Sequence, residues 1–229
     1  MQTVLNPEYK TGIFKQELKN RFLCEVEIDG ESTVCYVPSS CHLSNFLSLQ
    51  GEKVILIPTM AKDARTQYAV YAVPYKRSYL ILNTSMANRA IEASLRGRRF
   101  AYLGKRKNVI KEHYVDGYKS DLFIEDTNTI IEIKSVLSTD TYAKFPTVFS
   151  ERSLLQLEKL ERLMSAGYNV HYIIVSLNPY VKGINLLADT QFADALNKCI
   201  EHGMTISAFT CRLKDNKLQI EHMLQIVKK

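Results

Sequence analysis

Short runs of strand-forming residues recur at roughly ten-residue spacing through the first third of the chain. Asp29-Gly30, Gln50-Gly51 and Pro74 separate these runs, and such residues favour turns or interrupt strands. The rhythm is typical of a small β-barrel or sandwich rather than of a βαβ fold. We expect the strands at residues 21–28, 33–38, 53–58, 68–73 and 79–82.

The pattern changes after residue 80, where helices begin to alternate with strands. Asn83 or Thr84 caps a predicted helix that runs to Leu95, and Gly97 follows it. A hairpin and then alternating helices and strands predict a mixed α/β sheet. The further helices are expected at residues 151–166 and 192–202, and the strands at 120–124, 129–136, 170–176, 204–210 and 217–226. We therefore divide the chain into a small β-barrel domain over residues 1–77 and an α/β domain over residues 78–229.

The composition disfavours several classes of protein. Hydrophobic residues make up 46% of the 229 residues, which is enough to fill two modest cores. The five cysteines form no Cys-x-x-Cys pair, so disulfide staples and a structural zinc site are both disfavoured. Cys41 and His42 are adjacent and would point to opposite faces of a strand, which disfavours a nucleophile with its base.

Charge and hydropathy point to a particular setting. The net charge of +6 favours an anionic partner. The sequence has neither an apolar N-terminal leader nor a run of about 20 apolar residues that could span a membrane. We expect a cytoplasmic protein with reduced cysteines and no membrane contact.

The segment from Asp121 to Lys134 carries the most chemistry. If the hairpin turns symmetrically about Asp126-Thr127, Asp121 lies directly opposite Glu132. Directly opposed side chains lie about 5 Å apart. Glu132 and Lys134 share one face of their strand, because side chains alternate along a strand.

Two carboxylates this close repel each other by about 3 kcal/mol at an effective dielectric constant of about 20. A proton or a cation between them relieves that repulsion, and Mg²⁺ or Mn²⁺ suits one or two carboxylates with water and a phosphate oxygen. Asp121, Glu132 and Lys134 are therefore the predicted catalytic residues, with Lys134 orienting a water or stabilising charge on phosphorus. Asp121 and Glu132 are the predicted metal ligands, and Glu112 is an additional candidate.

The same residues could instead form a solvated strand face, since Asp…Glu-x-Lys strings are common. Glu132 and Lys134, however, interrupt the apolar run at residues 129–136, in a strand that we expect near the centre of the sheet. Buried charges at such a place need a functional or structural reason.

Residues 96–111 form a basic stretch with seven cations and no acidic residue. It can bind phosphates or be a solvated loop. Phe100 and Tyr102 lie within it and could stack on bases or pack in the core. The candidate DNA-binding residues are Arg96, Arg98, Arg99, Lys105, Arg106 and Lys107, together with Lys119.

An ordered series of short motifs runs along nearly the whole chain. The pieces are Arg21-Phe22-Leu23, Pro38-Ser39-Ser40-Cys41-His42-Leu43, Gly51-Glu52-Lys53-Val54, Asn83-Thr84 with Ala87-Asn88, Asp121, Ile131-Glu132-Ile133-Lys134-Ser135-Val136, Phe145-Pro146 and Glu151-Arg152. In this order they resemble the sugar fermentation stimulation protein (SfsA) family.

The resemblance implies an N-terminal OB-like barrel and a C-terminal domain of the PD-(D/E)XK restriction-endonuclease type. Members of the family are regarded as DNA-binding proteins and are linked in enteric bacteria to regulation of sugar-utilisation genes, so the resemblance also implies a DNA-binding protein. The family's acidic and lysine positions fall on Glu112, Asp121, Glu132 and Lys134. The sequence departs from the family where a Gly-containing turn is replaced at residues 38–41, where Lys119 replaces an Arg, and where Gln156 replaces a helical His.

Three functions follow from these features. The first is a metal-dependent nuclease acting on DNA phosphodiesters. The second is a DNA-binding regulator of sugar-metabolism genes that uses the same surface without cutting. The third is a scaffold whose charged cleft binds a protein or a small phosphorylated ligand. The oligomeric state is left open, with a homodimer among the alternatives.

Overall fold

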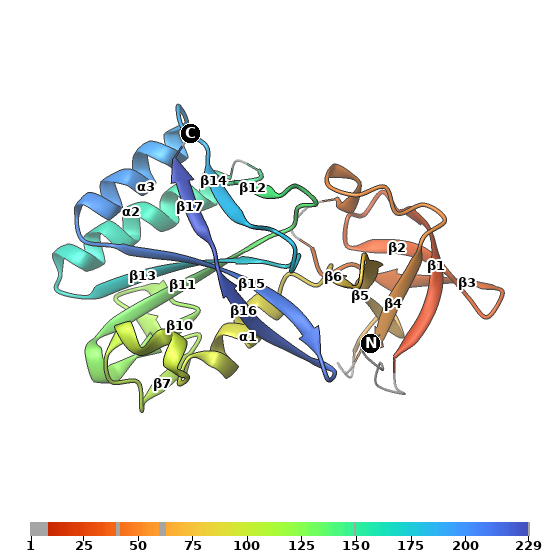
Figure 1. The fold of residues 1–229 in the computed structure, drawn as a ribbon, viewed down its shortest axis with the longest axis horizontal. Helices are drawn as coiled ribbons and strands as arrows, with labels where there is room; N and C mark the ends of the chain where they lie inside the picture. The colour runs from red at the N-terminus through yellow and green to blue at the C-terminus, as the bar shows by residue number, and fades with distance from the viewer. Residues whose placement is uncertain (1–8, 40–41, 60–62, 149, 229) are drawn as a thin grey trace.

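The computed structural model describes residues 9–39, 42–59, 63–148 and 150–228. The first domain is a closed five-stranded barrel (Figure 1). Its strands run in the order β3-β2-β1-β4-β5, and a pairing of Tyr36 with Ala69 joins β3 to β5 and closes the barrel. The strands are β1 (Lys10–Glu17), β2 (Leu23–Ile28), β3 (Glu31–Tyr36), β4 (Lys53–Pro58) and β5 (Tyr68–Tyr75).

The predicted strands of the first third are confirmed, and the barrel contains one more. β1 is missing from the sequence prediction because it carries three charged residues and Gly12, all of which are poor strand formers. Gly12 is required there, because a Cβ atom would lie 2.7 Å from the backbone oxygen of Glu27. β6 (Ser78–Ile81) follows β5 and hydrogen-bonds to it, so it extends the barrel's sheet beyond the boundary expected after residue 77.

The second domain is built on a six-stranded mixed sheet. Its order is β16-β15-β13-β11-β10-β7, which places β11 next to β13 near the centre, as the sequence predicts. β11, β13 and β15 are parallel, and the remaining pairs are antiparallel. The strands are β7 (Val109–Lys111), β10 (Leu122–Ile124), β11 (Thr129–Val136), β13 (Asn169–Ser176), β15 (Thr205–Lys214) and β16 (Lys217–Met223).

Helices cover both faces of this sheet. α2 (Glu151–Ser165) and α3 (Gln191–Glu201) lie on one face, and α1 (Met86–Ser94) with the 3₁₀ segment η2 (Arg98–Leu103) lies on the other (Figure 1). A β8–β9 hairpin (Tyr114–Val115 and Tyr118–Lys119) and a small parallel sheet of β12 (Tyr142–Phe145), β14 (Gly183–Leu186) and β17 (Gln225–Lys228) complete the domain.

Alternation along the central strands decides which core each side chain joins. Ile131 and Ile133 of β11 pack with the barrel and α1 in one continuous hydrophobic cluster. Ile130 and Val136 pack with α2 and α3 in a second cluster. Because the first cluster runs from the barrel strands into the sheet, the two domains are packed together.

Four of the five cysteines lie in the described residues, and all four are free and buried. Burial raises the pKa of each thiol, so none is an activated nucleophile. Cys41 lies outside the described residues. Among the described helices, none is long and apolar enough to cross a membrane.

Candidate active site

The hairpin of β10 and β11 has the predicted register. Leu122 pairs with Ile131, and Ile124 pairs with Thr129. A short 3₁₀ turn (Glu125–Thr127) and Asn128 in the left-handed conformation reverse the chain. One step beyond Leu122 on the same ladder, Asp121 lies opposite Glu132. The register that the sequence predicts for this hairpin is therefore confirmed.

Asp121 is held at a fixed place by two hydrogen bonds. The side-chain amide of Asn88, on α1, donates to Oδ1 at 2.9 Å, and the backbone N–H of Ile133 donates to Oδ2 at 2.7 Å. Burial, and then the negative charge of Glu132, raise the pKa of Asp121 to about 6. Glu132 is thus close enough to oppose the ionisation of Asp121.

Glu132 is 3% exposed, although its side chain is polar. Its Oε1 accepts from Lys134 Nζ at 2.7 Å and from Gln156 Nε2 at 3.3 Å, and its Oε2 accepts from the hydroxyl of Tyr118. Lys134 Nζ also donates to Gln156 Oε1 at 2.8 Å. Burial and the charge of Glu132 raise the pKa of Tyr118, so its phenol keeps the proton that it donates.

A cavity of about 640 Å³ joins these groups to the barrel. Asp121, Glu132 and Lys134 lie in its wall. α2 contributes Arg152 and Gln156, which are four residues apart and so share one helix face. The barrel side contributes Arg21, Ser39 and Phe46. The cavity therefore lies between the barrel and α2, and both domains build it.

Glu112, the additional candidate ligand, does not line this cavity. Its side chain is 73% exposed and pairs with Lys119 at 2.8 Å. It follows β7 with a positive φ of 47°, and its backbone N–H still donates to the backbone oxygen of Asp121 at 3.0 Å. Among the described residues, no group of three or more His, Cys, Asp or Glu side chains is placed to hold a metal ion.

The basic stretch is not part of the cavity wall either. Phe100 of η2 packs against Phe209, and the hydroxyl of Tyr102 lies 3.0 Å from His171 Nε2. His171 and Phe209 lie on the face of the sheet opposite to Glu132, because side chains alternate along β13 and β15 in register with β11. The stretch therefore lies across the sheet from the carboxylates. Phe100 is fully buried, so it packs in the core rather than stacking on bases.

Several cations of the stretch hold their own loop together. Arg106 Nε donates to the backbone oxygen of Leu95 at 2.9 Å, and Arg99 donates to that of Ile220 at 2.5 Å. Arg96 donates to the backbone oxygen of Lys107 at 3.1 Å. Lys105 pairs with Asp126 at 3.0 Å. Arg98 and Lys107 are exposed, and their side chains have no partner among the described residues.

The sequence prediction missed five residues that build the site. They are Tyr118, Asn88, Arg21, Arg152 and Gln156. A signal for four of them was present. Asn88, Arg21 and Arg152 lie within the motifs that carry the family resemblance, and Gln156 stands at a position singled out there as a departure. Tyr118 had no such signal, because a short hairpin places it.

Fold and site together define a class: a two-domain protein in which an OB-type barrel and a mixed α/β domain share a cavity lined by an Asp–Glu–Lys cluster. The chain belongs to the sugar fermentation stimulation protein family. The model of the "Sugar fermentation stimulation protein RE domain" matches residues 85–217, and that of the "SfsA N-terminal OB domain" matches residues 18–82.

Curated relatives match over nearly the whole chain. The sugar fermentation stimulation protein homolog of Caldanaerobacter subterraneus is 29% identical over 230 residues, which cover 98% of this chain and 99% of the relative. The homolog of Desulforamulus reducens is 26% identical and covers 97% of this chain and 94% of the relative.

A solved structure has the same fold. SfsA of Pyrococcus furiosus, described as a complex with Ca²⁺, superposes with a TM-score of 0.84 over 99% of both chains, at 18% sequence identity. The two-domain architecture predicted from the sequence is therefore confirmed.

Proposed function

We propose that this chain is a metal-dependent phosphodiesterase of the PD-(D/E)XK type that acts on DNA. The observation that carries the proposal is the pairing of two carboxylates in one cavity, where burial and the charge of Glu132 raise the pKa of Asp121. A divalent cation relieves that repulsion, and an ammonium group lies beside it in Lys134. Such a set of groups suits phosphoryl chemistry.

The donor set fits Mg²⁺ or Mn²⁺. Both ions prefer oxygen ligands, and Mg²⁺ commonly uses one or two carboxylates, with water and substrate phosphate completing its shell. The hydrogen bonds to Asp121 and Glu132 leave acceptor capacity on their oxygens, because a carboxylate offers about four lone-pair sites. The Ca²⁺ complex of the Pyrococcus furiosus relative agrees with a divalent cation in this fold.

The residues of the chain would divide the work. A bound divalent ion would lower the pKa of a water and neutralise charge that develops on phosphorus. Lys134, held by Glu132 and Gln156, would donate to a phosphoryl oxygen as that charge grows. Arg152 and Arg21 would hold the flanking phosphates, and Tyr118 would keep Glu132 in one orientation.

A DNA-binding regulator that does not cut is the second candidate. One observation favours it: Lys134 already neutralises Glu132 at 2.7 Å, and Gln156 contacts both side chains. The cavity then offers Arg21, Arg152 and Lys134 to a phosphate backbone without a metal ion.

The two candidates separate in one assay. Purified protein is incubated with plasmid and with single-stranded DNA in Mg²⁺, in Mn²⁺ and in EDTA. We expect metal-dependent cleavage that disappears in Glu132→Gln and in Lys134→Ala but persists in Glu112→Gln. Binding without cleavage in either metal would replace the nuclease with the regulator. Absence of DNA binding at low salt would leave only the charged-cleft scaffold.

A further inference from the structure

The barrel presents exposed aromatic side chains beside the cavity. Phe22, just before β2, and Tyr36, at the end of β3, are 37% and 38% exposed. Their rings are stacked, with centroids 6.4 Å apart and planes inclined by 23°. The guanidinium carbon of Arg21 lies 4.7 Å from the centre of the Phe22 ring. We call Arg21, Phe22 and Tyr36 the aromatic platform.

Arg21 also lies in the wall of the cavity that holds Asp121 and Glu132. One side chain therefore belongs both to the platform and to the proposed reaction site. A strand of nucleic acid that enters the cavity would pass the platform within the reach of a single nucleotide, because Arg21 touches both.

The rings of Phe22 and Tyr36 lie outside the hydrophobic core of the barrel. Phe22 takes part in the barrel through its backbone, whose oxygen accepts from Val37 N at 2.8 Å. Tyr36 points outward, whereas its neighbour Cys35 is fully buried. Exposed apolar rings that are grouped, rather than scattered, mark a binding surface more often than a packing residue.

The charges on the two sides of the aromatic platform differ. Further along β2, the outward positions include Glu25, which repels phosphate, and Glu27, whose charge is paired with Lys15 at 2.7 Å. At the platform end, Arg21 lies in the same cavity wall as Arg152 and Lys134. These three cations attract phosphate. A polyanion is therefore favoured on the side of the platform that faces the cavity.

We propose that the aromatic platform stacks on unpaired bases, so that the substrate is single-stranded nucleic acid whose backbone runs into the cavity. The inference rests on the proposed function for the chemistry, while binding itself can be tested without cleavage. Stacking needs an open ring face on the base, and pairing in a duplex hides that face. The cations of the cavity would contact phosphates and carry no sequence preference.

The test is fluorescence anisotropy with a short labelled single strand and with the duplex of the same sequence, in EDTA and again in Ca²⁺. We expect wild type to bind the single strand more tightly. Phe22→Ala with Tyr36→Ala should weaken single-strand binding about tenfold or more and leave duplex binding unchanged. Phe22→Trp should retain the affinity. Tyr114→Ala removes a 68% exposed tyrosine on β8, outside the cavity wall, and should change nothing.

Circular dichroism and thermal unfolding of the double variant establish that it is folded. Equal affinity for duplex, or single-strand binding that survives loss of both rings, would overturn the inference. Platform-dependent binding without cleavage in Mg²⁺ or Mn²⁺ would uphold the platform and remove only the nuclease. Cleavage that shows no strand preference and is unchanged by the double variant would uphold the nuclease and remove only the platform.

Discussion

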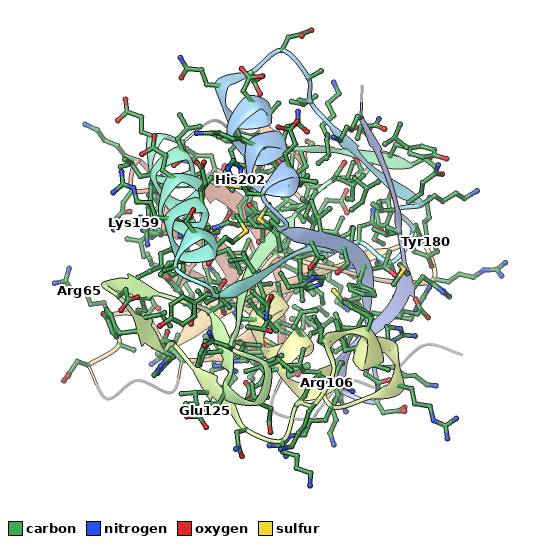
Figure 2. All side chains as sticks on the ribbon, turned by 90° about the vertical axis from the view of Figure 1, so that its left-hand side faces the viewer. Arg65, Arg106, Glu125, Lys159, Tyr180 and His202 are labelled. Atoms are coloured by element: carbon green, nitrogen blue, oxygen red, sulfur yellow. The ribbon has the colours of Figure 1, made fainter. Side chains whose placement is uncertain are left out.

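The carboxylate cavity and the basic stretch are both rich in charge, and the fold uses them in opposite ways. In the cavity, Glu132 is buried beside Asp121. Burial and the charge of Glu132 raise the pKa of Asp121 to about 6. In the basic stretch, Arg99 and Arg106 donate to backbone oxygens. Arg106 lies on the side of the molecule away from Lys159 of α2 (Figure 2).

The difference separates two kinds of charged cluster. A cationic side chain that donates to nearby carbonyl oxygens stabilises a loop, and those oxygens partly offset its charge. Carboxylates that are buried together cost folding free energy and are retained where a ligand relieves the cost. Density of charge along the sequence did not distinguish these cases, whereas placement on one strand face did.

The largest expected effect is on cleavage in the cavity. Lys134→Ala removes the ammonium that would stabilise charge on phosphorus, and we expect the cleavage rate to fall about 100-fold or more. Arg98→Ala in the basic stretch should change the rate by less than about twofold, because that residue lies across the sheet. Initial rates on a labelled strand at saturating Mg²⁺ measure both. Similar losses in the two variants would break the comparison.

The second effect is on the free energy of unfolding, and its size depends on pH. The raised pKa of Asp121 means that the folded chain holds a proton between pH 3.8 and about 6 that the unfolded chain releases. This contribution to the free energy of unfolding is therefore present below pH 3.8 and is lost as pH rises through 6.

Asp121→Asn removes the ionisable group, and with it the loss of unfolding free energy as pH rises. We expect it to raise the free energy of unfolding by about 1 to 3 kcal/mol at pH 7.5 and to bring no comparable gain at pH 4. Urea unfolding of both proteins at the two pH values measures the difference. A change of the same sign and size at both pH values would mean that the carboxylate is not under electrostatic strain.

A third, opposite effect is expected in the basic stretch. Arg106→Ala leaves the carbonyl groups of Leu95 and Gly104 without their donor, and we expect a loss of about 1 to 2 kcal/mol of unfolding free energy. Lys107→Ala, one residue away and exposed, is the matched control and should leave stability within about 0.5 kcal/mol. Equal stability of the two variants would show that Arg106 holds nothing in place.

The smallest effect is on DNA affinity from the exposed cations of the stretch. Arg98→Ala with Lys107→Ala should weaken binding by about twofold or less, whereas Arg152→Ala should weaken it about tenfold for every sequence, since it would contact the backbone. Filter binding at low salt compares them. A larger loss in the Arg98 and Lys107 pair would restore the stretch as the main DNA contact.

The sequence was informative where local rules act. The alternation of β11 and the symmetric turn after Ile124 were enough to predict that Asp121 lies opposite Glu132. Nothing local could place Arg21 there, because it reaches the cavity through packing of the barrel on the second domain. Glu112 lies beside Asp121 on the ladder, but its side chain pairs with Lys119 instead of lining the cavity, and no local sequence rule predicts that pairing.

The most direct test of the central claim is a calorimetric titration of the protein with Mn²⁺ near pH 7.5. The account predicts binding in wild type and in Glu112→Gln, and its loss in Asp121→Asn and in Glu132→Gln. Binding that survives both of the latter substitutions, or that disappears in Glu112→Gln, would contradict a divalent-cation site formed by the paired carboxylates.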